Sequence, residues 1–422
     1  MGGRRPGRHL LHAHRRVLGA LLALAGVADL PPLVPTHDLG DRAKLAQFLD
    51  RFDAGWRALA EHQSRCDVQV PPADTCDGAH WAQTLSDYLA TPDYVDVFWR
   101  RRGRAKDPAL ELRLRRGWPT VVDAALRSDP FVRQVWEPLQ DSLSAFRPEV
   151  GGLIVTRDQA REIMRHDEDR ARRRAAYESG SALSQRSSPD LVELIRRRNV
   201  FAQRLGYTDF SELALECQGL DGARMEALED TLETLTGPAY RELLARIQSG
   251  LGVFQLHGWD LLYGQQTLDA PPDSSIRSEE ARARVLRFVR ELGLRVDTLP
   301  IELRFERLAP WSARMVPVSP PARIVILINP GDGLDPQVSL FHEYGRALLE
   351  GSLPDPRPTA RGVPEAWRDV VGSLFGSFAV ERPWLAAAHS LSPDLVDVYR
   401  HGWADSRLLS LRGALIDRKS VV

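Results

Sequence analysis

The stretch "FHEYGRALLEG", Phe341–Gly351, contains His342 and Glu343, followed by Arg346. In a helix the side chains at positions 342 and 346 lie one turn apart on the same face. A His-x-x-x-His pair binds one zinc ion in this way, while the intervening glutamate reaches a metal-bound water. Arg346 stands where the second histidine of that pattern belongs. A guanidinium is always protonated, has no lone pair for a metal and repels a dication. The stretch therefore predicts a helix with the geometry of a zinc site but with one ligand missing.

The segment before this helix predicts a β-strand. "ARIVILIN", Ala322–Asn329, is a nearly continuous apolar run bounded by Pro321 and by the turn residues "PGDG". Gly351 is well placed to end the helix that follows. We therefore expect a strand, a turn and the His-Glu helix in that order.

A second candidate helix follows in "VPEAWRDVVGSLFGSF". Glu365 and Asp369 are four residues apart in it, so both side chains point to the same side of a helix. Glu365 is suited to bind zinc, and Asp369 to accept a hydrogen bond from a ligand histidine. A His-Glu pair or a Glu-x-x-x-Asp pair alone occurs by chance in many proteins. The strand and both helices in this order form a more specific pattern.

Composition limits the classes of partner. The chain has 422 residues, of which 43% are hydrophobic, enough to bury a sizeable core. Its 56 basic and 57 acidic residues nearly cancel. No overall field draws it to nucleic acid or to an anionic membrane.

Most of the chain has the apolar spacing of amphipathic helices. Apolar residues recur three and four apart in Asp41–Gln63 and Pro189–Gly206. The strongly charged segment Thr156–Leu183 predicts a long helix or a helix pair that forms a solvated face. The basic run Trp99–Asp107 is interpreted as a solvated loop or helix end, with an anion-binding patch as the alternative.

The N-terminus predicts export. Basic residues precede the apolar run "VLGALLALAGVA", Val17–Ala28, which ends in small residues suited to a signal peptidase. Removal of residues 1–28 would give a periplasmic or secreted protein with no stable membrane anchor, since twelve apolar residues are too few to span a bilayer. The alternatives are a mistaken upstream start and an ordinary buried helix. After export, Cys66 and Cys76 could form a disulfide, leaving Cys217 outside any disulfide and buried.

The sequence resembles the zinc oligopeptidases of the thimet oligopeptidase and oligopeptidase F group, and more distantly the angiotensin-converting enzyme group. Beyond the His-Glu helix, the resemblance rests on "LVELIRRRNVFAQRLGYTDFSELALECQGLD", Leu191–Asp221, and on "HGWDLLYG", His257–Gly264. It covers roughly residues 156–412. It implies a mostly α-helical fold with a deep groove and one small β-sheet. We expect a helical region at 29–150 and a shortened catalytic-like domain at 151–422.

The resemblance also implies roles for individual residues. His342 would be the first zinc ligand, Glu343 the general base, Glu365 the third ligand and Asp369 the carboxylate that orients a ligand histidine. An alignment on "SLFGSF" instead puts Asp369 at the ligand position. The strand would offer the edge that binds peptide in extended form, through Ile324, Val325, Ile326, Leu327 and Ile328.

Two departures from the family bear on activity. One is Arg346, which we expect to pair with Glu365 in place of the metal. The other is the C-terminal part, which in the family carries tyrosine and histidine donors. Here the late residues Tyr399 and His401 are expected on a surface helix.

Two functions remain open. One is a weakened metallopeptidase with zinc held by His342, Glu365 and water. The other is an inactive protein without zinc, either a peptide-binding pseudo-peptidase or a truncated product. The sequence does not reveal the oligomeric state.

Overall fold

The structure is a computed structural model that describes residues 40–69, 76–269, 276, 281–291, 293, 299–306, 312–329 and 331–420. The chain divides into two compact units, each built from separate segments. The first comprises residues up to Pro130 together with Ser278–Gly331 and Asp335–Ser377. The second comprises Phe131–Arg277, Asp332–Leu334 and the residues from Phe378 onward.

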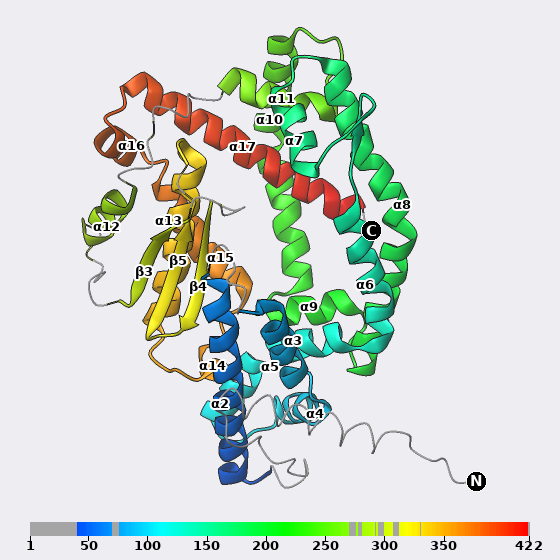
Figure 1. The fold of residues 1–422 in the computed structure, drawn as a ribbon, viewed down its shortest axis with the longest axis vertical. Helices are drawn as coiled ribbons and strands as arrows, with labels where there is room; N and C mark the ends of the chain where they lie inside the picture. The colour runs from blue at the N-terminus through cyan, green and yellow to red at the C-terminus, as the bar shows by residue number, and fades with distance from the viewer. Residues whose placement is uncertain are drawn as a thin grey trace. The chain divides into compact units, whose positions relative to one another are not determined.

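The first unit contains N-terminal helices, a three-stranded sheet and the helices that follow it (Figure 1). Its elements are α2 (Arg42–Asp67), α3 (Gly78–Leu89), α4 (Pro92–Arg101), α5 (Pro108–Ser128), α12 (Ala281–Glu291), β3 (Ile301–Phe305), β4 (Ala313–Ser319), β5 (Arg323–Ile328), α13 (Leu334–Ser352), α14 (Pro358–Arg361) and α15 (Glu365–Phe378).

Aromatic side chains fill the core between the first helices. Phe52 of α2 packs against Tyr88, Tyr94 and Phe98, and all four are buried. Aspartates begin α2, α3 and α5, because their carboxylates accept the unpaired amides of the first turn. The apolar spacing and these caps explain why the N-terminal segment folds into helices.

The three-stranded sheet has the order β3-β5-β4. β5 pairs in parallel with β3 and antiparallel with β4. Five of the six residues of β5 are buried, as expected for a strand covered on both faces. The C-terminal end of α13 packs against this sheet, since a Cβ at Gly351 would lie 3.5 Å from Ile324 Cδ1.

The second unit is built mainly of helices. Its elements are α6 (Pro130–Ala145), β1 (Glu149–Val150), β2 (Leu153–Ile154), α7 (Arg157–His166), α8 (Arg170–Arg204), α9 (Phe210–Gln218), α10 (Gly222–Leu251), α11 (Gly258–Asp269), α16 (Arg382–His389) and α17 (Pro393–Ser420). Gly151 and Gly152 join the two short strands with φ angles of 61° and 81°, which suit a tight hairpin turn.

The mostly helical fold with a small sheet is confirmed, with three differences. The β1–β2 hairpin forms a second small sheet. The charged segment Thr156–Leu183 is a helix pair, but not all of it is solvated. Arg170 and Arg173 of α8 bind the buried carboxylate of Asp260. The division also differs from the expected boundary at residue 150, because the strands and α13–α15 belong to the same unit as the N-terminal helices.

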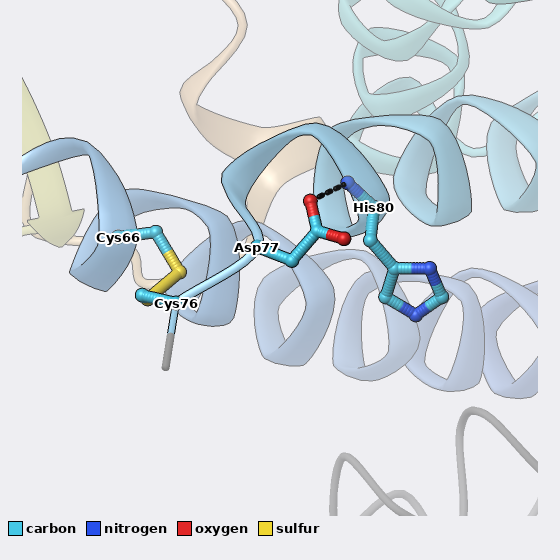
Figure 2. The surroundings of a disulfide bond; sticks show 4 residues. All are labelled: Cys66, Cys76, Asp77 and His80. Atoms are coloured by element: carbon cyan, nitrogen blue, oxygen red, sulfur yellow. Dashed lines mark hydrogen bonds between the residues drawn. A yellow bond between two sulfur atoms is a disulfide. The ribbon is translucent and has the colours of Figure 1, made fainter. Parts of the chain in front are cut away.

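The cysteines are arranged nearly as expected. A disulfide joins Cys66 to Cys76, beside the start of α3 (Figure 2). Cys217 forms no disulfide among the described residues and is half-buried rather than buried. The expected signal peptide, residues 1–28, lies outside the described residues. None of the described helices has the length and apolar character needed to cross a membrane.

Candidate functional site

The residues singled out from the sequence lie on two helices of the first unit. His342, Glu343 and Arg346 are on α13. Glu365 is the first residue of α15, and Asp369 follows one turn later. The expected strand precedes α13, as β5.

Glycines allow α13 and α15 to approach closely. A Cβ at Gly345 of α13 would lie 2.8 Å from Phe375 Cβ. A Cβ at Gly372 of α15 would lie 2.7 Å from His342 Nε2 and 3.0 Å from Arg346 Cγ. Real Cβ atoms do not come this close, so a larger residue at either position would force the helices apart. Because glycine has no side chain at these two positions, the two helices that carry the site can lie this close together.

Arg346 lies among three carboxylates. Its Nη2 donates a hydrogen bond to Glu365 Oε1, the contact that the sequence predicted. Its Nη1 lies 3.6 Å from Glu343 Oε1 and 3.9 Å from Asp369 Oδ1. The side chain of Arg346 is 21% exposed, whereas that of Glu365 is 48% exposed. The guanidinium thus provides a positive charge to all three acidic groups.

His342 and Asp369 face each other without a hydrogen bond. His342 Nε2 is 3.9 Å from Asp369 Oδ1, which is beyond hydrogen-bonding distance. The pair is ionic only when the imidazole is protonated. His342 therefore lies next to the carboxylates but is not oriented by them.

Glu343 is held by the sheet. Its Oε2 accepts a hydrogen bond of 2.9 Å from the backbone N–H of Met315 in β4. Its side chain is only 13% exposed. A hydrogen bond to an ionised carboxylate is stronger than one between neutral groups. The contact fixes the position of Glu343 relative to the outer edge of β4.

Arg368 is a second arginine that contacts Glu365. Both residues belong to a longer row of side chains with alternating charges. Arg368 Nη1 lies 3.3 Å from Glu365 Oε2, and Arg368 Nη2 lies 3.6 Å from Glu350 Oε2. Glu350 is buried and accepts a 3.0 Å hydrogen bond from buried Arg361. We call Arg361, Glu350, Arg368, Glu365 and Arg346 the arginine–carboxylate row.

Sequence reasoning did not predict this row beyond the Arg346–Glu365 pair. The three-residue spacing of Glu365 and Arg368 in a helix was a signal for one further contact. The contact between Arg361 and Glu350 has no such signal, because Glu350 lies in α13 and Arg361 in α14, with the irregular segment 353–357 between the two helices.

The connection between the two site helices is anchored in the core. Asp53 of α2 accepts hydrogen bonds of 2.8 Å from Thr359 N, 2.6 Å from Thr359 Oγ1 and 2.7 Å from Arg113 Nη2. All three residues are buried. Burial raises the pKa of the Asp53 carboxyl above its ordinary value, although the hydrogen bonds from Thr359 and Arg113 lower it. These contacts tie α14, which lies between α13 and α15, to α2 and α5.

The residues present do not fit a zinc ion. A catalytic zinc site has three protein ligands and a water. Within the described part of the chain, no group of three or more His, Cys, Asp or Glu side chains has the arrangement of a metal site. At the position of the second ligand, Arg346 offers hydrogen-bond donors and no lone pair. It also engages Glu365, which the family resemblance assigned as the third ligand.

The predicted peptide-binding edge is on the wrong strand. β5, with Ile324 to Ile328, is the central strand and is paired on both sides, so it has no edge for a peptide. Among the described residues, β4 pairs only with β5. The N–H of Met315 points away from β5, toward Glu343. The edge beside the candidate site is therefore that of β4.

The late tyrosine also differs from expectation. Tyr399 on α17 is buried, so it belongs to the packing of the second unit and not to a surface. His401, two residues later, is exposed as predicted.

The fold is similar to those of solved peptidase structures. A protein assigned as an oligoendopeptidase F from Bacillus anthracis strain Ames has a TM-score of 0.58 and 15% identity, with 97% of this chain and 76% of that chain covered. Pz peptidase A with an inhibitor has a TM-score of 0.61 and 15% identity, with 98% and 75% covered. Another structure assigned as an oligoendopeptidase F has a TM-score of 0.61 and 16% identity, with 98% and 74% covered.

No protein-family model matches the sequence, and a search of curated proteins gives no match. At these identities the likeness establishes the fold alone.

Proposed function

We propose that this chain, which shares its fold with oligopeptidases, binds peptides without hydrolysing them by zinc chemistry. The observation that carries the proposal is the position of Arg346 between Glu343, Glu365 and Asp369. In this account the arginine replaces the metal as the cation of the site.

Charge balance supports this replacement. Three ionised carboxylates close together repel one another, which destabilises the fold unless a cation lies between them. A guanidinium suits this place because its planar fork donates hydrogen bonds to several carboxylate oxygens at once. It cannot polarise a peptide carbonyl as a Lewis acid does, nor activate a bound water. Arg346 would therefore keep the electrostatic role of a metal and lose its chemical role.

The outer edge of β4 supports peptide binding. In an antiparallel pair, backbone groups alternate between pointing to the partner strand and pointing away from it. Since Met315 points away from β5, Ala313 and Pro317 do so too. Pro317 has no backbone N–H. An edge strand tolerates proline at a position whose N–H would point away from the neighbouring strand. An extended peptide can add to this edge through the N–H and C=O of Ala313 and the C=O of Met315, since the Met315 N–H already donates to Glu343.

A binding and cleavage experiment on one peptide pool tests the proposal. The probe is an equimolar mixture of fluorescein-labelled ten-residue peptides. Fluorescence anisotropy measures binding, and mass spectrometry measures cleavage in the presence of added zinc. We expect saturable binding and intact peptides. Zinc-dependent cleavage would instead support a peptidase whose metal is held by His342, Glu365 and water, and the absence of binding would contradict a peptide-binding role.

One variant tests whether β4 is the binding edge. Ala313→Pro removes an N–H that points away from β5, so it leaves the β4–β5 ladder intact. We expect it to weaken peptide binding by roughly tenfold, the effect of about 1.4 kcal/mol. Glu302→Ala on β3 is the control and should leave binding unchanged. Equal affinity of the Ala313→Pro variant and the unaltered chain would place the peptide elsewhere.

A further inference from the structure

The disulfide lies at the point where α2 meets the sheet. Cys66 is in the last turn of α2, and Cys76 directly precedes the cap of α3, where Asp77 accepts a hydrogen bond from the backbone N–H of His80 (Figure 2). A Cβ at Gly78 would be 3.4 Å from Cys66 Cβ, so the start of α3 packs closely on this cysteine. The disulfide therefore fixes the C-terminal end of α2 to the beginning of α3.

The two residues after Cys66 contact the sheet directly. Val68 is buried in one cluster with Val316 and Val318 of β4 and with two residues of β5. Its carbonyl oxygen accepts a 2.8 Å hydrogen bond from Arg304 of β3. Asp67 lies 3.4 Å from Arg314 of β4. The end of α2 thus contacts all three strands.

These contacts share one face of the sheet. Arg314, Val316 and Val318 alternate along β4, and side chains two apart in a strand point to the same face. Between them lies Met315, whose backbone N–H donates to Glu343 at the outer edge. Arg314 and Val316, which contact the end of α2, therefore lie on either side of Met315, the residue that links β4 to the candidate site.

We propose that the Cys66–Cys76 disulfide positions β4 and that its reduction loosens the outer edge of this strand. The last turn of a helix frays more easily than the helix interior. With the disulfide formed, Asp67 and Val68 stay on the sheet. Once it is broken, only the noncovalent contacts of Asp67 and Val68 hold the last turn of α2 on the sheet, so this turn leaves the sheet more often and the Met315–Glu343 hydrogen bond loses part of its support. The outer edge of β4, beside the candidate site, would then depend on whether the Cys66–Cys76 disulfide is formed or reduced.

The reductant is a dithiol. Cys76 is half-buried and Cys66 is buried, so the dithiol thiolate attacks Cys76 Sγ. The Cys66–Cys76 bond breaks, a mixed disulfide forms at Cys76, and Cys66 leaves as a thiolate that takes up a proton. The second thiol of the reductant then attacks its own sulfur in the mixed disulfide and releases Cys76 as a thiol. The protein disulfide gains two electrons, and the dithiol is oxidised to a disulfide.

Hydrogen exchange of the folded chain with and without dithiothreitol tests the proposal, and it requires no peptide ligand. We expect amide exchange in β4 to become roughly tenfold faster or more on reduction, while exchange in α8 and α17 of the second unit stays the same. The Cys66→Ser/Cys76→Ser double variant should show the fast exchange without reductant. Cys217→Ser should exchange as the unaltered chain does and keep its response to reductant.

Two valine variants distinguish the effect of the contact between Val68 and β4 from the effect of the disulfide. Val68→Ala retains the disulfide but weakens the contact with β4, so it should speed β4 exchange under oxidising conditions and respond less to reductant. Val150→Ala, a buried valine of the second unit, is the matched control and should leave β4 exchange unchanged. Unchanged β4 exchange on reduction would overturn the proposal. Equal acceleration of amide exchange in both units would overturn the proposal as well, because it would show general unfolding and not a local effect on β4.

Discussion

Arg346 carries one positive charge at the position from which a zinc-binding helix would present its second histidine. The His-Glu-x-x-His spacing placed Arg346 on the same helix face as His342, and the family resemblance, which implied Glu365 as the third ligand, predicted the contact between Arg346 and Glu365. The sequence did not reveal how exposed the contact is. Glu365 is about half exposed, so water screens the pair, and its contribution to stability is smaller than that of a buried ion pair.

Replacing Arg346 measures this contribution. Arg346→Ala leaves Glu343, Glu365 and Asp369 without their shared cation, and we expect it to lower the free energy of unfolding by about 1–2 kcal/mol. Arg127→Ala removes an exposed helical ion pair to Asp123 and should change this free energy by no more than about 0.5 kcal/mol. The measurement is urea unfolding followed by circular dichroism. Equal effects of the two substitutions would show that Arg346 does not stabilise the carboxylates.

At the scale of elements, the distance between α13 and α15 depends on Gly372. Gly372→Ala places a Cβ against the His342 ring and the Arg346 stem, and we expect a loss of about 1–3 kcal/mol from overpacking. Gly376→Ala, one turn later, meets nothing closer than 3.5 Å and should be neutral or slightly stabilising, since alanine favours a helix. Thermal unfolding of both variants compares them. Equal stability of the two would contradict the close approach of the helices at His342.

Two aspartates bind Arg113, and the connection through α14 predicts that replacing them changes the stability of the fold by different amounts. Asp53 is buried and Asp50 is 58% exposed, yet each pairs with Arg113. Asp53→Ala leaves Arg113 and Thr359 N without a buried acceptor and should destabilise by about 3–5 kcal/mol. Asp50→Ala should cost less than about 1 kcal/mol. Chemical denaturation measures both, and a similar loss for the two would show that the network does not anchor α14.

The strand order illustrates what the sequence indicated and what it did not. The apolar run of β5 predicted a strand correctly, and its lack of alternation is typical of a strand buried on both faces. That signal argued against an edge position. Proline in "ARMVPVS", the β4 sequence, was the signal for the edge. The pairing of β5 with β3 depends on residues more than twenty positions away, so local pattern alone could not establish it.

At the scale of the whole molecule, the division into units was not predictable from composition. The first unit combines N-terminal helices with segments from the last third of the chain. Contacts such as that of Arg113 with Thr359, which are 246 residues apart, depend on the folded topology. The His-Glu helix and its partner helix were predictable because their spacing is local. The segments that brace them were not, since their contacts are distant in sequence.

The zinc content of the purified chain tests the central claim most directly. The full chain is prepared without chelators, equilibrated with excess zinc, passed through gel filtration and measured by inductively coupled plasma mass spectrometry. Because Arg346 removes a ligand and adds a positive charge, zinc affinity should fall by more than the roughly 10- to 100-fold typical of losing a supporting contact. We predict a zinc content far below one ion per chain, rising in Arg346→His. One zinc ion per unaltered chain would contradict the replacement of the metal by arginine.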